Sequence, residues 1–140
     1  MYLFDTNILS EVLKKRPDQG LLERLSGIPG HLQFTSCICV MELRYGSKRR
    51  PDHENFWKKI EDKLLSQVKI LPIAKDTALI AGDIAANLSL DGRGISPEDL
   101  LIAATAVEKG GTLVTANQRH FRDIEGLKIE NWMNNSDTSQ

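Results

Sequence analysis

Four side chains in this sequence combine residue types and positions that suit metal-assisted chemistry. Asp5, Glu42 and Asp99 are carboxylates, and Asn117 adds an amide oxygen. Oxygen ligands suit Mg²⁺ and Mn²⁺, and Mg²⁺ usually takes one or two protein carboxylates while keeping waters and substrate phosphate oxygens. An ion held in this way orients a water, lowers the pKa of that water and offsets the charge that builds on a phosphodiester. Hydrolysis of a phosphodiester is therefore one hypothesis for these residues.

Each of the four residues also has an ordinary structural interpretation. Asp99 lies three residues after Ser96, so it fits a helix-capping box as well as a metal site, and spacing alone favours the cap. Asp5 could cap a helix that follows a first strand, and Glu42 could be a solvated surface acid. Asn117 could close a turn through its own backbone bonds. Taken singly, every acid is better explained as structural.

The spacing of apolar residues predicts the elements that would position these side chains. Strands are predicted at residues 1–5, 32–36, 68–73, 112–115 and 128–130. Helices are predicted over residues 8–13, with caps at Thr6 and Asn7, and over 17–26, 38–46, 52–66, 77–88 and 100–109. The alternation predicts one three-layer α/β/α domain with a mainly parallel sheet over residues 1–132, and a loose polar tail over 133–140.

Three of the predicted helices carry apolar side chains at helical spacing. Ile38, Met41 and Tyr45 recur at helical spacing in one helix, and Phe56, Trp57, Ile60 and Leu64 form the apolar stripe of the next. In the third, Leu79, Ile80, Ile84 and Leu88 are expected to face inward. Residues 116–122 are too polar for this pattern and are predicted to form a loop. These assignments decide which helix faces meet the sheet.

The predicted topology brings the four candidate residues toward one rim. In open α/β sheets, ligands lie beyond the carboxyl ends of the strands, where the connections diverge to opposite faces. Asp5 follows the first strand and Asn117 follows the strand at 112–115. Glu42 falls in the second turn of its helix and Asp99 in the first turn of its own. We expect all four to converge there.

The overall charge gives no sign of a nucleic-acid partner. The net charge is −1, so the chain lacks a global basic field, and any such partner must be met locally. Basic clusters occur at residues 14–16, at 48–50 and around Arg119 and Arg122, although such runs are more often solvated faces.

The composition favours a soluble cytoplasmic protein. Cys37 and Cys39 are one residue apart, which suits small core residues in a reducing cytoplasm better than a disulfide. The histidines at 31, 53 and 120 have no metal-ligand spacing, which disfavours a zinc hydrolase. No secretion signal is visible, and the longest nearly apolar stretch, at 100–107, is far shorter than the ~20 residues of a membrane helix.

The sequence motifs around the acids resemble those of a known protein family. Successive segments read LFDTN at 3–7, VMELRYG at 40–46, GRGI at 92–95 leading to DLLIAATA at 99–106, and LVTAN at 113–117 followed by His120-Phe121. Four such segments, in this order and at these separations, resemble PIN-domain ribonucleases, specifically VapC-type toxins of type II toxin–antitoxin systems. The match runs from residue 1 to about Trp132.

The resemblance implies an endoribonuclease that needs Mg²⁺ or Mn²⁺, held by Asp5, Glu42 and Asp99. It further implies a homodimer, a small VapB-like antitoxin that neutralises the toxin, and a structured RNA such as a tRNA as substrate. Family members place a polar residue, often an acid, near position 117, where this chain has Asn117. Asn117 is therefore expected to be an auxiliary catalytic residue without a charge.

The alternatives differ in what they require of the sequence. A receiver-type phosphoacceptor needs an acid pair after the first strand, and a haloacid-dehalogenase-like phosphatase needs a second aspartate where Asn7 stands. The open alternative is a catalytically inactive PIN-fold module that binds RNA or protein. The surface of Phe56, Trp57 and Ile60 could meet an antitoxin or a second copy, or could pack in the core.

Overall fold

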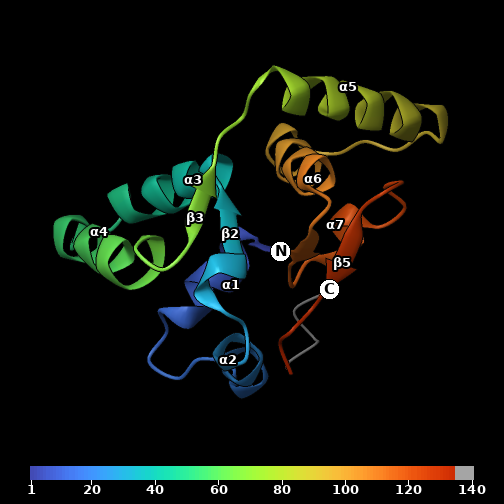
Figure 1. The fold of residues 1–140 in the computed structure, drawn as a ribbon. Coiled ribbons are helices and arrows are strands. Elements are labelled where there is room, and N and C mark those ends of the chain that lie inside the picture. Colours follow the sequence, from blue (N-terminus) through green and yellow to red (C-terminus); the bar gives the residue numbers. More distant parts are fainter. Residues whose placement is uncertain (135–140) are drawn as a thin grey trace.

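The computed structural model describes residues 1–134, which form a sheet of five strands covered by helices (Figure 1). The strands are β1 (Tyr2–Phe4), β2 (Gln33–Ser36), β3 (Lys69–Leu71), β4 (Thr112–Val114) and β5 (Lys128–Glu130). Their order in the sheet is β3-β2-β1-β4-β5, and every neighbouring pair is parallel. The predicted α/β class and parallel sheet are confirmed.

Helical segments connect these strands. They are α1 (Thr6–Val12), α2 (Gln19–Ser26), the 3-10 turn η1 (Gly30–Leu32), α3 (Cys37–Lys48), α4 (His53–Ile60), the π-helical segment η2 (Glu61–Leu65), α5 (Lys75–Leu90), α6 (Pro97–Lys109) and α7 (Gln118–Phe121). Most of the tail expected at 133–140 lies outside the described residues. Its first two residues are described: Met133 packs against the core, and the Asn134 backbone N–H donates to Asp18 Oδ1 at 2.9 Å.

The strand order creates a switch point beside β1. From β1 the chain runs to β2 and β3 on one side, and it then crosses to β4 and β5 on the other side. The connections that leave the carboxyl ends of β1 and β4 therefore diverge, which makes this the place where such folds bind ligands. Asp5 and Thr115 are the first residues beyond these two strands.

The core lies between the central strands and the helices that cover them. Leu3, Phe4, Leu113 and Val114 are at most 1% exposed, as expected for parallel strands buried on both faces. Small residues of α6, among them Ala103 and Ala104, are fully buried. In Figure 1, α5 runs alongside α6 on the outside of the molecule. No helix within residues 1–134 is long and apolar enough to cross a membrane.

In α3 the buried residues are not those whose spacing first indicated the helix. Cys39, Leu43 and Ser47 are buried, whereas Met41 and Tyr45 are 50% and 65% exposed. The spacing 39, 43, 47 is also a helical stripe, and it is this stripe that meets the core. The predicted end of the helix at Gly46 was wrong, because α3 continues to Lys48.

In α5 the prediction was right for Ile84 and Leu88 and wrong for Leu79. Ile84 and Leu88 are buried together with Thr77 and Ala81, while Leu79 is 57% exposed. Residues 77, 81, 84 and 88 share one helix face, and a residue two positions from 77 and 81 falls on the opposite side. Apolar type alone therefore did not identify the core face.

The segment at 52–66 and the polar loop also differ from the prediction. The expected single helix consists of α4 followed by the π-helical η2, and the loop predicted at 116–122 contains the short helix α7. Ile60 is fully buried, and Phe56 and Trp57 are half-buried against the core. The guanidinium of Arg50 lies 3.8 Å from the Phe56 ring centroid. Core packing therefore explains most of this stripe.

Candidate metal centre

Asp5 occupies the end of β1 and caps α1. Its Oδ1 accepts a hydrogen bond from the Thr6 backbone N–H at 2.8 Å, so the predicted capping role of Asp5 is confirmed, and the cap expected from Thr6 and Asn7 is wrong. Its Oδ2 accepts from the Thr115 hydroxyl at 2.7 Å and from the Asn7 amide at 3.2 Å. The side chain is only 4% exposed, so these donors hold it in one orientation.

The environment of Asp5 opposes its ionisation. Burial raises the pKa of this carboxyl above its ordinary value, and the nearby charges of Asp99 and Glu42 raise it further. The hydrogen bonds from Thr115 and Thr6 act in the opposite direction but do not cancel the effect of burial. A bound cation would remove this penalty, because an opposite charge favours the ionised form.

Glu42 approaches Asp5 from α3. It lies in the second turn of that helix, as predicted, and its Oε1 accepts a 2.6 Å hydrogen bond from the Thr6 hydroxyl. Thr6 thus contacts Asp5 with its backbone and Glu42 with its side chain. Within residues 1–134, neither carboxylate forms an ion pair with a lysine or arginine.

Cys39 completes a group of three possible metal ligands. One ligand atom from each of Asp5, Cys39 and Glu42 lies within 4.8 Å of the other two. Cys39 is fully buried, which confirms its interpretation as a core residue, but its place beside the acids was missed. The signal in the sequence is the spacing, because residues 39 and 42 share one face of a helix.

Asp99 lies in the first turn of α6, where the capping interpretation is confirmed and the metal interpretation stays a prediction. Its backbone N–H donates to Ser96 Oγ at 3.2 Å, so the predicted cap is present and uses the backbone of Asp99. The carboxylate is left for other contacts, and its Oδ2 lies 3.2 Å from His120 Nδ1. Asp99 is close enough to raise the pKa of Asp5, although it is not in the three-residue group.

Asn117 follows β4 and precedes α7. Its backbone N–H donates to Thr115 Oγ1 at 3.0 Å, and its carbonyl accepts from the His120 N–H at 3.0 Å. The side chain does not cap α7. The backbone bonds agree with the turn-closing interpretation, and a part for the side-chain amide at the metal stays a prediction.

Sequence reasoning missed the polar residues that lock the acids in place. Thr115 is fully buried between Asp5 and the backbone of Asn117, and Asn7 Oδ1 accepts from the Ala116 N–H at 3.1 Å. These bonds join the ends of β1 and β4 across the switch point. Thr115 and Asn7 lie within the segments LVTAN and LFDTN, but their partners are more than a hundred residues away.

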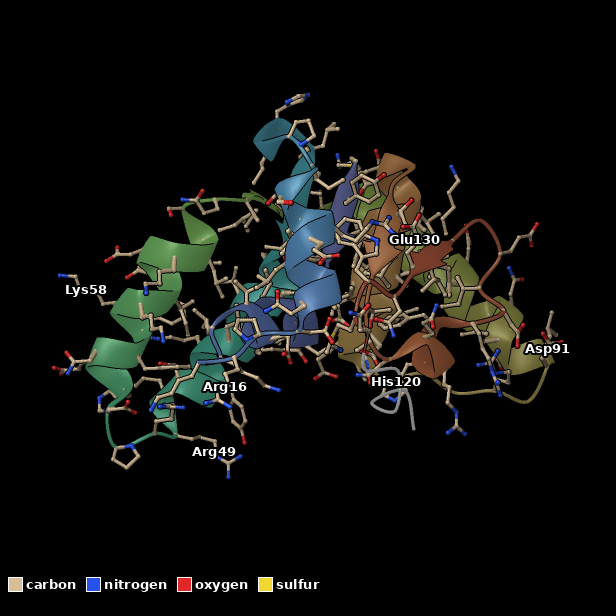
Figure 2. The ribbon with its side chains drawn as sticks, turned by 90° about the horizontal axis from the view of Figure 1, so that it is seen from below. Arg16, Arg49, Lys58, Asp91, His120 and Glu130 are labelled. Carbon is tan, nitrogen blue, oxygen red and sulfur yellow. The ribbon has the colours of Figure 1, made fainter. Side chains whose placement is uncertain are left out.

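Two open hollows flank the acids. One is lined by Met41, Glu42, Tyr45 and Glu98. The other is lined by residues 93–96 together with Asp99, Arg119 and His120. Arg93, Arg119 and His120 are the basic residues of the second hollow, whereas Lys58 projects from the outer side of α4, away from His120 (Figure 2). The fold thus brings positive charge to the acids only locally, as the net charge suggests.

Comparison with known proteins assigns the fold to a family. The family model described as the PIN domain matches residues 2–127. The chain belongs to the PIN-domain family. Ribonuclease VapC2 of Haemophilus influenzae is 38% identical over 132 residues, which cover 94% of this chain and 98% of that PIN-domain relative. The tRNA(fMet)-specific endonuclease VapC of Shigella flexneri is 32% identical, with 94% and 97% covered.

Solved structures of PIN-domain proteins show the same fold. VapBC2 from Rickettsia felis, bound to a DNA fragment from its promoter, superposes with a TM-score of 0.85 at 30% identity, covering 94% of this chain and 98% of the other. DNA-bound VapBC from Salmonella typhimurium gives a TM-score of 0.86 at 30% identity, covering 94% and 97%. The resemblance to VapC-type PIN domains and the expected PIN-like fold are therefore confirmed.

Proposed function

We propose that this chain is a Mg²⁺- or Mn²⁺-dependent endoribonuclease and the toxin of a toxin–antitoxin pair. The observation that supports it is the pair of carboxylates, Asp5 and Glu42, held together at the switch point without a cationic partner among the described residues. Asp99 adds a third negative charge nearby. Such a site has the hard oxygen donors that suit Mg²⁺ or Mn²⁺.

Asp5, Glu42 and Asp99 are the residues that would hold the ion. The bound ion would supply a water of lowered pKa and would offset the negative charge that develops on the phosphodiester. The protein fixes the ligands in advance. Thr115 and Asn7 orient Asp5, and Thr6 orients Glu42, so little rearrangement is needed when the ion arrives.

The proposed partners are an RNA substrate, a VapB-like antitoxin and a second copy of the chain. VapBC complexes among the structural relatives support the antitoxin, and the names of the curated relatives support RNA. For a second copy, the chain offers exposed apolar side chains at Met41 and Tyr45 on α3 and at Leu79 on α5. The inactive-module alternative is not favoured, because every curated relative described above is named as a ribonuclease or endonuclease.

An RNA cleavage assay tests the proposed activity. Pure protein is incubated with total RNA in Mg²⁺ or Mn²⁺, and the new RNA ends are mapped. We expect discrete cleavage sites that disappear in EDTA and in the Asp5→Asn variant. Cleavage that persists in EDTA would show that the chain does not use these carboxylates as an ion site.

A further inference from the structure

The acid cluster contains a sulfur ligand that Mg²⁺ chemistry does not use. Cys39 lies one helical turn before Glu42, and its Sγ is in the group of ligand atoms that lie within 4.8 Å of one another. The side chain is fully buried, and Sγ donates a hydrogen bond to the Phe4 carbonyl at 3.7 Å. Two elements thus contribute the three ligand atoms: the end of β1 supplies one, and two successive turns of α3 supply one each.

Hard and soft ions would treat this thiol differently. In the metal-free site the Cys39 thiol donates its hydrogen to the Phe4 carbonyl, so it is present as a neutral group. Mg²⁺ and Mn²⁺ prefer carboxylate, carbonyl and water oxygens and leave a thiol protonated. Zn²⁺ binds thiolate strongly and deprotonates a coordinating thiol outright.

We propose that Cys39 is a third ligand at this site, which enables it to bind Zn²⁺ and similar thiophilic divalent ions together with Asp5 and Glu42. The inference builds on the proposed metal-dependent function and adds a determinant of ion selectivity. On binding, the S–H bond breaks, a metal–sulfur bond forms and the proton passes to solvent. Because the same carboxylates are used, Zn²⁺ and Mg²⁺ exclude each other.

The geometry needs a contraction of about 1 Å. Zinc–sulfur bonds are about 2.3 Å and zinc–carboxylate bonds about 2.0 Å, so sulfur and oxygen ligands of a tetrahedral ion lie about 3.5 Å apart. The three ligand atoms now lie within 4.8 Å of one another. The half-buried Glu42 has side-chain bonds that can rotate, so its carboxylate can supply part of this contraction.

Cobalt spectroscopy tests the sulfur ligand directly. Co²⁺ replaces Zn²⁺ in such sites and gives a near-ultraviolet sulfur-to-metal charge-transfer band only where a thiolate is bound. We expect the band when Co²⁺ is added to the metal-free wild-type protein and to Cys37→Ser, and its loss in Cys39→Ser. Cys37 is the matched control, because it lies two residues earlier on α3 and outside the ligand group.

Competition titrations measure the selectivity. In Cys39→Ser the Zn²⁺ affinity should fall roughly 10- to 100-fold, at least the loss seen when outer partners of metal ligands are removed. The Mn²⁺ affinity should change much less. A wild-type protein that binds Mn²⁺ but shows no cobalt band would overturn the inference and leave the proposed function intact. Failure to bind any divalent ion would overturn both, and neither wild-type result depends on how well the variant folds.

Discussion

At the scale of single residues, the site depends on carboxylates that are costly to bury. Asp5 is 4% exposed, and its pKa is raised chiefly by that burial. A chain gains nothing in stability from such an arrangement unless a cation or a proton neutralises it. The buried thiol of Cys39 adds a group that stays neutral until a soft ion binds.

Asp99 separates the capping and metal interpretations. Asp99→Asn should abolish RNA cleavage, because the variant loses a charge that we assign to the ion site. Its stability should fall by at most ~1 kcal/mol, since the cap uses the retained backbone N–H and the side-chain contact with His120 is partly exposed. RNA cleavage assays and chemical denaturation measure the two effects.

Ser96→Ala is the matched control for this prediction. It removes the hydroxyl that caps α6 and should cost ~0.5–2 kcal/mol while RNA cleavage continues. If Asp99→Asn cleaves RNA at the wild-type rate, Asp99 is a structural residue and has no place at the ion.

The raised pKa of Asp5 predicts how stability depends on pH. The folded state binds this proton more tightly than the unfolded state, whose carboxyl has the ordinary pKa of 3.8. The metal-free protein therefore loses stability as pH rises from that value through the raised one, and stays at the lower level above it. Denaturation is measured for wild-type protein and Asp5→Asn from pH 4 to 7. The unfolding free energy of wild type minus that of Asp5→Asn should fall as pH rises.

Saturating Mn²⁺ provides the control for the pH experiment. A bound cation neutralises the ionised carboxylate, so the ion should stabilise wild-type protein more at pH 7 than at pH 4 and should have little effect on Asp5→Asn. If the unfolding free energy of metal-free wild type minus that of metal-free Asp5→Asn rises with pH, the pKa of Asp5 is not raised by folding.

At the scale of elements, the turn from β4 to α7 brings Asn117 to the rim. An amide oxygen brings no charge, so Asn117→Asp would add a fourth acid to the site. Affinity for hard cations depends on ligand charge, so this variant should lower the Mg²⁺ concentration for half-maximal cleavage and slightly destabilise the metal-free protein. The Mg²⁺ dependence of cleavage measures the first effect.

Asn117→Ala tests the same turn in the other direction. It should reduce cleavage less than Asp5→Asn does, because only an auxiliary contact is lost. If the Mg²⁺ dependence of cleavage is unchanged in Asn117→Asp, only the backbone role of Asn117 remains, in which its N–H donates to Thr115 Oγ1 and its carbonyl accepts from the His120 N–H.

Local patterns predicted the elements better than their faces. Strands and helices follow from apolar period and capping residues, so the alternation and the place of Asp5 and Glu42 on it could be predicted. The same period did not show that Met41 and Leu79 face outward, because two apolar stripes compete on one helix and packing decides between them. The contacts of Thr115 with Asp5 and of Thr6 with Glu42 join distant segments and left no local signal.

At the scale of the whole molecule, the proposed second copy would contact large apolar side chains that are exposed in the single chain. Met41, Tyr45 and Leu79 are at least half exposed. The surface of Phe56, Trp57 and Ile60, which the sequence suggested as a contact for a partner, is partly buried in the core. Contiguous exposed apolar patches are typical of interaction surfaces, whereas single exposed apolar residues are common on any protein.

Substitution of the exposed Leu79 tests the expected homodimer. Wild-type protein should have a dimeric mass in light scattering, and Leu79→Arg should shift it toward the monomer by placing a charge in an apolar contact. Trp57→Ala is the matched control and should leave the mass dimeric. A monomeric mass for wild-type protein would contradict a dimer contact through α5. A Leu79→Arg dimer that dissociates at the same protein concentration as wild type would also show that α5 is not in the dimer interface.

The central claim is that Asp5 and Glu42 hold a divalent ion, and direct measurement of Mn²⁺ binding tests it. Free Mn²⁺ has an electron paramagnetic resonance signal that decreases on binding, so a titration gives stoichiometry and affinity without an activity assay. We predict saturable binding to the wild-type protein that is lost in the folded Asp5→Asn and Glu42→Gln variants. Equal binding by wild-type protein and both variants, or no binding to wild type, would contradict the assignment.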